Sequence, residues 1–191
     1  MFRCLVVLAT AGPAGAGEPS QWIAGAYSFS DELGGFLITG ISGIGSKTNP
    51  VVIEQEMLSA SAVTLIIRAR TPIRPYSEAG IYANGMIHMR IRALNNSGIA
   101  WTEFEFELQE IFGQPSTFGD GLSFDQRRTS DENRHSNVFA VHNADFEPFD
   151  RLLFTDGHVD PLEIADFGFF ITDFTPKREF YLRQDPRVPL S

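Results

Sequence analysis

Apolar and polar residues alternate most regularly in two segments of the chain, residues 86–94 and residues 101–108. In the first segment, isoleucine, methionine and alanine alternate with histidine and arginine. In the second, phenylalanine and leucine alternate with glutamate. Side chains of a β-strand point to opposite faces in turn, so each segment is predicted to be a strand with one apolar and one charged face.

We expect these segments to pair as a hairpin that turns at residues 95–98, Asn-Asn-Ser-Gly. A shift of the register by one residue would bring arginines against phenylalanines, so the alternation fixes the parity of the pairing. The charged face is expected to lie in solvent, where its ion pairs align the strands. The expected cross-strand pairs are Arg92–Glu103, Arg90–Glu105 and His88–Glu107 outside, with Ile91–Phe104 and Met89–Phe106 in the core.

Short apolar segments separated by turn residues make up the rest of the chain from Trp22 onward. The first two predicted strands are expected to form a hairpin, because the loop between them contains two glycines. Residues 112–134 lack a regular pattern and are predicted to be a long surface loop. The predicted strands outside the central pair are residues 24–30, 36–42, 51–58, 63–70, 137–142, 151–155, 164–172 and 179–183.

About ten short strands at this spacing predict an all-β protein, a two-sheet antiparallel β-sandwich of jelly-roll or immunoglobulin-like type. No repeat or linker divides the chain, so residues 17–191 are predicted to form one domain. Phenylalanines at alternating strand positions are expected to fill the space between the sheets. These are Phe104, Phe106, Phe154, Phe167, Phe169 and Phe180.

Composition narrows the choice of partners. The formal net charge is −9, which disfavours nucleic acids and anionic membranes, because binding to either depends on basic residues. Cys4 is the only cysteine, so neither an internal disulfide bond nor a cysteine zinc site is expected. No later segment is long and apolar enough to be predicted as transmembrane.

The N-terminus is typical of an export signal. Arg3 precedes a short apolar run, and Ala14-Gly15-Ala16 fits the small-x-small rule for cleavage before Gly17. Residues 1–16 are therefore predicted to be a signal peptide, and the mature protein is expected in the periplasm or outside the cell. The alternative is that the apolar run forms a first β-strand.

A glycine-rich segment, residues 40–48, resembles a phosphate-binding loop only in part. Such a loop needs lysine directly after its second glycine and a helix beginning there. Here Lys47 comes one position late, and Asn49-Pro50 and a β-rich run follow. We expect a loop that leaves a strand.

Acidic loops offer candidate calcium ligands, because calcium prefers oxygen ligands from loop carboxylates and carbonyls. The candidates are Asp120 and Asp125 in one loop and Asp156 and Asp160 in another. The EF-hand order is absent from both. The alternative is that these aspartates only build turns.

Catalytic residues are not predicted. Glu103, Glu105 and Glu107 have a spacing compatible with paired carboxylates of a glycoside hydrolase, but arginines opposite them would lower the pKa of the acid that catalysis needs. The four histidines are scattered, and no nucleophile motif surrounds a serine. Trp22 and Trp101 are candidate platforms for a sugar ring, with packing in the core as the alternative.

Two stretches carry a family resemblance, Asn96–Leu108 (NSGIAWTEFEFEL) and Phe154–Phe167 (FTDGHVDPLEIADF). They resemble segments of exported bacterial β-sandwich proteins of the PEP-CTERM-associated, choice-of-anchor-like kind. The resemblance implies export and a sandwich fold and implies no catalytic residues. The printed chain ends in RQDPRVPLS, without the sorting tail of those proteins.

These observations lead to three hypotheses about function. The first is an exported, non-enzymatic binding or structural module whose partner is an extracytoplasmic protein or a glycan. The second is a carbohydrate-binding module, with or without stabilising calcium. The third is a hydrolase without a recognised motif, because hydrolases also use sandwich folds.

Overall fold

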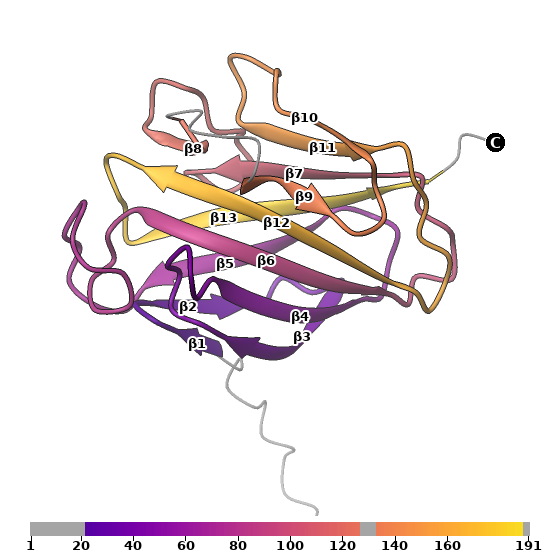
Figure 1. Ribbon diagram of the computed structural model, residues 1–191, viewed down its shortest axis with the longest axis horizontal. Coiled ribbons are helices and arrows are strands. Elements are labelled where there is room, and N and C mark those ends of the chain that lie inside the picture. Colours follow the sequence, from indigo (N-terminus) through magenta and orange to yellow (C-terminus); the bar gives the residue numbers. More distant parts are fainter. Residues whose placement is uncertain (1–21, 127–132, 189–191) are drawn as a thin grey trace, which may run out of the picture.

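The computed structural model describes residues 22–126 and 133–188, which form two β-sheets packed face to face (Figure 1). One sheet has seven strands in the order β1-β2-β5-β13-β7-β11-β10. The other has six, in the order β3-β4-β6-β12-β8 with β9 paired to β12. Every pair of strands is antiparallel except β4 and β6. The predicted all-β sandwich is confirmed.

The described residues contain thirteen strands, a few more than the sequence predicts. They are β1 (Trp22–Ala24), β2 (Tyr27–Ser30), β3 (Phe36–Ser42), β4 (Val51–Met57), β5 (Val63–Ala69), β6 (Met86–Asn95), β7 (Glu103–Gln109), β8 (Leu122–Phe124), β9 (His135–Ser136), β10 (Val141–Asn143), β11 (Arg151–Thr155), β12 (Ile164–Asp173) and β13 (Glu179–Arg187).

The core between the sheets is built largely from phenylalanine. Phe104 on β7 meets Phe167 on β12 across the sandwich, with ring centroids 4.6 Å apart. Phe106 and Phe169 form a similar pair at 4.8 Å. All six phenylalanines predicted to lie in the core are buried. Burying a side chain of this size stabilises the fold by about 1.5–3 kcal/mol, so these contacts hold the two sheets together.

A polar pair interrupts this apolar core. Gln55 on β4 and Gln184 on β13 are both buried and face each other from opposite sheets. Their amides exchange two hydrogen bonds, of 2.8 Å and 3.2 Å. Because buried amides are costly unless they are hydrogen-bonded, this pair favours one alignment of the two sheets.

The predicted hairpin between β6 and β7 is wrong, because these strands belong to different sheets. Strand β6 lies between β4 and β12, and β7 lies between β13 and β11. The assignment of faces was nevertheless right, because Met89, Ile91, Phe104 and Phe106 all point into the core. A strand with one apolar face can bury that face against the core from either sheet of the sandwich. Alternation alone therefore did not identify the partner strands.

Residues 95–102 form a corner between the sheets in place of the expected hairpin turn. Asn95 is buried and donates hydrogen bonds from Nδ2 to the carbonyl oxygens of Ile99 and Val159. Trp101 is also buried and forms a β-bridge with Val159. These contacts anchor the crossing segment to the chain just before β12.

The expected hairpin between residues 24–30 and 36–42 is also wrong. Strand β2 lies in the seven-stranded sheet and β3 in the six-stranded sheet, so the glycine-containing loop again crosses the sandwich. The first hairpin is instead β1–β2. Gly25 permits its tight turn, because φ is 53° there and a Cβ atom would lie 2.7 Å from the Ile44 carbonyl oxygen.

Other expectations concern single segments of the chain. The strand predicted at residues 137–142 is largely wrong, because only its last two residues belong to a strand, β10; residues 137–140 connect β9 to β10, which lie in opposite sheets. The predicted signal peptide, residues 1–16, lies outside the described residues. No helix within the described part of the chain could cross a membrane.

Candidate ligand-binding face

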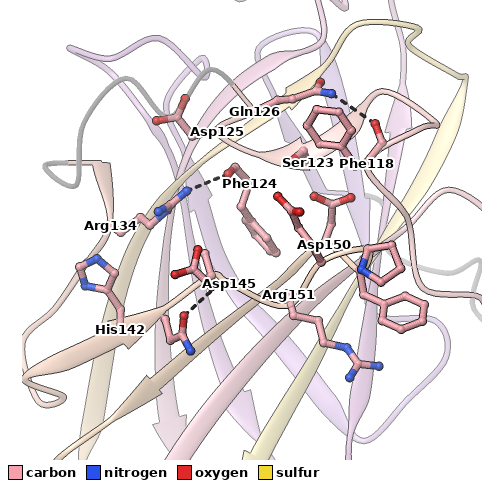
Figure 2. Close-up of a pocket in the computed structure, with 15 residues that line it drawn as sticks. Phe118, Ser123, Phe124, Asp125, Gln126, Arg134, His142, Asp145, Asp150 and Arg151 are labelled. Carbon is pink, nitrogen blue, oxygen red and sulfur yellow. Dashed lines mark hydrogen bonds between the residues drawn. The ribbon is translucent and has the colours of Figure 1, made fainter.

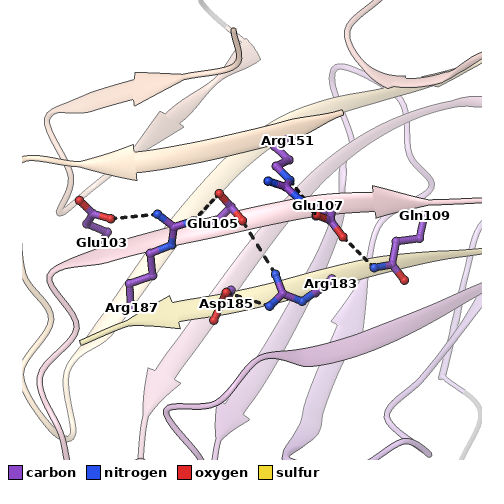
Figure 3. A network of polar contacts seen from close by, with 8 residues as sticks. All are labelled: Glu103, Glu105, Glu107, Gln109, Arg151, Arg183, Asp185 and Arg187. Atoms are coloured by element: carbon purple, nitrogen blue, oxygen red, sulfur yellow. Dashed lines mark hydrogen bonds and ion pairs between the residues drawn. The ribbon is translucent and has the colours of Figure 1, made fainter. Parts of the chain in front are cut away.

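Charged side chains cover the outer face of the seven-stranded sheet along three adjacent strands (Figure 3). The alternation that sends phenylalanines of β7 inward sends its acidic side chains outward. The register then places arginines from both neighbouring strands beside them. We call this set the ion ladder, and its members are Glu103, Glu105, Glu107, Gln109, Arg151, Arg183, Asp185 and Arg187.

One end of the ion ladder centres on Arg187. This arginine donates to Glu105 at 2.6 Å and to Glu103 at 3.3 Å. Arg183 lies 3.8 Å from Glu105 and donates to Asp185 at 2.9 Å. Each guanidinium therefore lies between two carboxylates, and each carboxylate has a cationic partner.

Glu107 is the centre of the other end. Its Oε2 atom accepts a hydrogen bond of 2.7 Å from Arg151, and its Oε1 atom accepts one of 2.8 Å from the Gln109 amide. Gln109 Oε1 in turn accepts a 2.8 Å hydrogen bond from the backbone N–H of Gly113. Gly113 has a φ of 78°, a conformation that glycine adopts readily, so the loop after β7 is fastened back onto the sheet.

The expectation of a solvated glutamate face is wrong for two of the three glutamates. The side chains of Glu105 and Glu107 are only 4% exposed, although they point away from the core. The three arginines of the ladder lie against them and are themselves 31–40% exposed. The predicted partners Arg90 and Arg92 lie on the other sheet, where they pair with Asp166.

A pocket of about 410 Å³ opens beside Glu107. We call it the face pocket. Phe112 stands at its rim, 56% exposed, and packs against Tyr181 with ring centroids 5.4 Å apart. The face pocket is lined by Thr64, Glu107, Gln109, Phe112, Gly113, Pro115, Arg151 and Arg183. It thus places an aromatic surface next to fixed carboxylate, amide and guanidinium groups.

A second pocket, of about 350 Å³, lies at one edge of the sandwich and is lined from β8, β10 and β11 and the segments next to them (Figure 2). We call it the edge pocket. Its lining includes His142 and several carboxylates, among them Asp145 and Asp150. Burial raises the pKa of Asp150 to about 6, and the nearby charge of Asp120 adds to this effect. The Oδ2 atom of Asp150 is inaccessible to solvent, which agrees with burial as the main cause of the raised pKa.

The four calcium candidates do not converge. Asp120 accepts hydrogen bonds from the backbone N–H groups of Thr117 and Leu122, as a turn residue does. Asp125 is buried at the edge pocket, while Asp156 and Asp160 are exposed in another loop. Across residues 22–126 and 133–188, no three His, Cys, Asp or Glu residues are grouped as ligands of a metal ion.

The two candidate sugar platforms are packed into the fold. Trp101 has no exposed surface, its ring meets Phe104 edge-on, and its Nε1 atom donates to Ser97. Trp22 is half-buried and packs against the core. Neither tryptophan offers a free ring face comparable with that of Phe112.

Two histidines and the glycine-rich segment singled out in the sequence lie outside the ion ladder. His88 stacks on Phe170 with ring centroids 4.1 Å apart, and burial lowers its pKa. His158 lies in an exposed loop. Residues 46–49 close a turn through a short β-bridge, and β4 follows where a phosphate-binding loop would begin a helix.

Sequence reasoning missed Phe112 and the arginines of β11 and β13. Phe112 lies in the segment predicted to be an irregular loop, and Arg151, Arg183 and Arg187 are far from β7 in the chain. One signal was present, because Arg183, Asp185 and Arg187 alternate in the last strand as the glutamates do in β7. Comparison with known proteins finds no matching family model, no matching curated protein and no matching solved structure.

Proposed function

We propose that the protein is an exported, non-enzymatic β-sandwich binding module whose ligand-binding surface is the ion ladder with the face pocket. The observation that carries the proposal is the burial of Glu105 and Glu107 on the outer face of a sheet. Export is supported by the signal-like residues 1–16 and by the resemblance to exported sandwich proteins.

Stability alone is a weak explanation for the ion ladder. Removing two charges from water costs about as much as their attraction returns, so well-packed apolar residues would hold the sheet equally well. A binding site, in contrast, benefits from polar groups whose positions are fixed before the ligand arrives. The ladder meets this requirement, because its carboxylates are held by guanidinium groups on rigid neighbouring strands.

Mapping of ligand contacts by NMR tests the binding surface. The folded protein would be titrated with a panel of amino acids, short peptides, nucleotides, and mono- and oligosaccharides. We expect at least one class to shift the backbone amides of Thr64, Gln109 and Gly113. The amides of Arg90 and Arg92, on the outer face of the other sheet, are the internal control. Shifts spread over both faces, or confined to the control face, would contradict the proposal.

Export has a separate test. Cell fractionation should recover the protein outside the cytoplasm, with an N-terminus that begins at Gly17. A variant with Ala14 and Ala16 changed to arginine should stay unprocessed, because the small residues required for cleavage are gone. Recovery of the intact chain in the cytoplasm would contradict export and would leave the mapped binding surface standing.

A further inference from the structure

We propose that the face pocket binds one residue of a neutral oligosaccharide, with the sugar ring against Phe112 and its hydroxyl groups on the partly exposed Thr64, Arg151 and Arg183. This inference rests on the proposed function, because it names the ligand class of the same surface. It moves the sugar platform from the two tryptophans to a phenylalanine in the loop after β7.

The aromatic part of the site is Phe112. Its side chain is 56% exposed, yet its ring packs on Tyr181 and is therefore supported from one side. The C–H face of a pyranose is apolar and flat, and it stacks on such a ring. An aromatic side chain provides this surface at a low cost in conformational entropy, since only two side-chain torsions must be fixed. Pro115 adds a second apolar wall to the pocket.

The accessible polar part of the face pocket consists of the Thr64 hydroxyl and the guanidinium groups of Arg151 and Arg183, which hydrogen-bond the hydroxyl groups of a sugar. Glu107 and Gln109 lie beneath these groups, each 3% exposed, where Glu107 holds Arg151 and Gln109 holds the backbone of Gly113. Arg183 has five N–H donors and directs one nitrogen toward Asp185. Because Glu107 and Asp185 hold the two guanidinium groups in place, their other N–H groups can bind a sugar without rearranging the network.

The charge balance favours a neutral ligand. The ion ladder contains four carboxylates and three guanidinium groups, and each group lies within ion-pair distance of an opposite charge. An anionic ligand such as a phosphate would meet Glu107 at the pocket, and a cationic ligand would meet Arg151 and Arg183. A hydroxyl-rich neutral molecule would satisfy both kinds of group at once.

The face pocket has room for one part of a longer oligosaccharide, and the sheet beside it can hold the rest. Its volume of about 410 Å³ lies within the range of small-molecule sites. Beyond Glu107, the ion ladder continues along the same face of the sheet to Glu103 and Arg187 (Figure 3). Neighbouring sugar residues can therefore extend along the outer face.

Isothermal titration calorimetry with neutral tetrasaccharides of glucose, xylose, mannose, galactose or N-acetylglucosamine tests the inference. We expect one of them to bind, and Phe112→Ala to weaken that binding at least tenfold. Phe112→Trp should retain it. Phe118→Ala is the matched control, because Phe118 is 60% exposed at the edge pocket; its affinity should equal that of the unchanged protein. Gln109→Ala, checked for folding by NMR, should also weaken binding.

Two results would overturn the inference. One is the absence of binding to all five tetrasaccharides by folded protein, and the other is an equal loss of affinity in Phe112→Ala and Phe118→Ala. The proposed function and the glycan inference can fail independently. If peptides or nucleotides shift the amides of Gln109 and Gly113 while no sugar binds, the surface is a binding site and the glycan assignment is wrong.

Discussion

The outer faces of the two sheets carry the same types of charged residue and differ in how many carboxylates are buried beneath the arginines. On the six-stranded sheet, Arg90 and Arg92 are 49% and 42% exposed, and Arg92 pairs with the exposed Glu54. On the seven-stranded sheet, Glu105 and Glu107 are almost fully covered by arginines and by the loop after β7. Ion pairs of the first kind contribute about 0–1 kcal/mol. Charges of the second kind are costly to bury and depend on their partners. The six-stranded sheet buries one such carboxylate, Asp166, beside Arg90 and Arg92, whereas the seven-stranded sheet buries two and has the face pocket beside Glu107.

Phe104→Ala should cause the largest loss of stability, because it removes a core side chain from the inner face of β7. Phe104 has no exposed surface and meets three aromatic rings in the core. The variant should lose about 3–5 kcal/mol in free energy of unfolding, measured by urea denaturation. An unchanged midpoint would mean that the inner and outer faces of β7 are interchanged.

Glu107→Ala should show how far the two outer faces differ. The change removes the acceptor of Arg151 and Gln109, leaving partly buried donors unpaired, and should cost about 2–3 kcal/mol. Glu54→Ala is the matched control on the other sheet and should cost about 0–1 kcal/mol. Equal losses in the two variants, by the same urea assay, would remove the distinction between the faces.

The glutamine pair tests whether a buried polar contact can be replaced inside the core. Gln184→Leu leaves the buried Gln55 amide without its partner and should destabilise the protein by about 1–3 kcal/mol. Adding Gln55→Leu should recover most of that loss, because no unpaired amide then remains. A double variant whose loss equals the sum of the single losses would show that the two amides do not act as a pair.

Stability should change with pH in opposite directions for two groups of carboxylates. Burial raises the pKa of Asp150 and Asp173 to about 6, so the folded state takes up protons before the unfolded state as pH falls from about 7 to about 5. The contribution of these two carboxylates to stability should rise in that interval, against the opposite contribution of His88, whose pKa is lowered by burial. Hydrogen bonds lower the pKa of Glu32, chiefly from Arg68, and of Glu179, chiefly from Tyr181. Their stabilising contribution is lost when pH falls below their usual range.

Thermal unfolding at several pH values measures both effects. The variant Asp150→Asn, combined with Asp173→Asn, should remove the contribution of the two carboxylates to Tm on mild acidification, because neither amide titrates. Glu32→Gln should weaken the loss of Tm at lower pH. The same change in Tm between about pH 7 and about pH 5 in the unchanged protein and in the double variant would contradict the first expectation.

Alternation predicted the orientation of side chains better than the pairing of strands. Ile91 and Phe106 face the core as the pattern predicts, yet their strands are not neighbours. The loop at residues 31–35 misled in the same way, because glycines permit both a hairpin turn and a crossing between sheets. The local pattern shows which face of a strand is apolar. It does not show which sheet the strand joins, because the inner faces of both sheets pack against the same core.

The candidate site was less accessible to sequence reasoning. Glutamates of β7 were recognised as a charged face, but their partners come from β11 and β13, about 45 to 85 residues further along the chain. Burial of an outward-facing carboxylate depends on those distant arginines and on a loop without periodicity. No local pattern contains that information.

The sequence by itself determined an all-β sandwich, a phenylalanine core and the inward and outward faces of its longest strands. These properties follow from periodicity and side-chain volume, which are local. Tertiary structure alone decided which strands are neighbours, that Asn95 and Trp101 build a corner, and that Glu107 lies buried beside Phe112. Such properties arise when segments far apart in the chain come together, and their energies depend on the partner that each side chain meets.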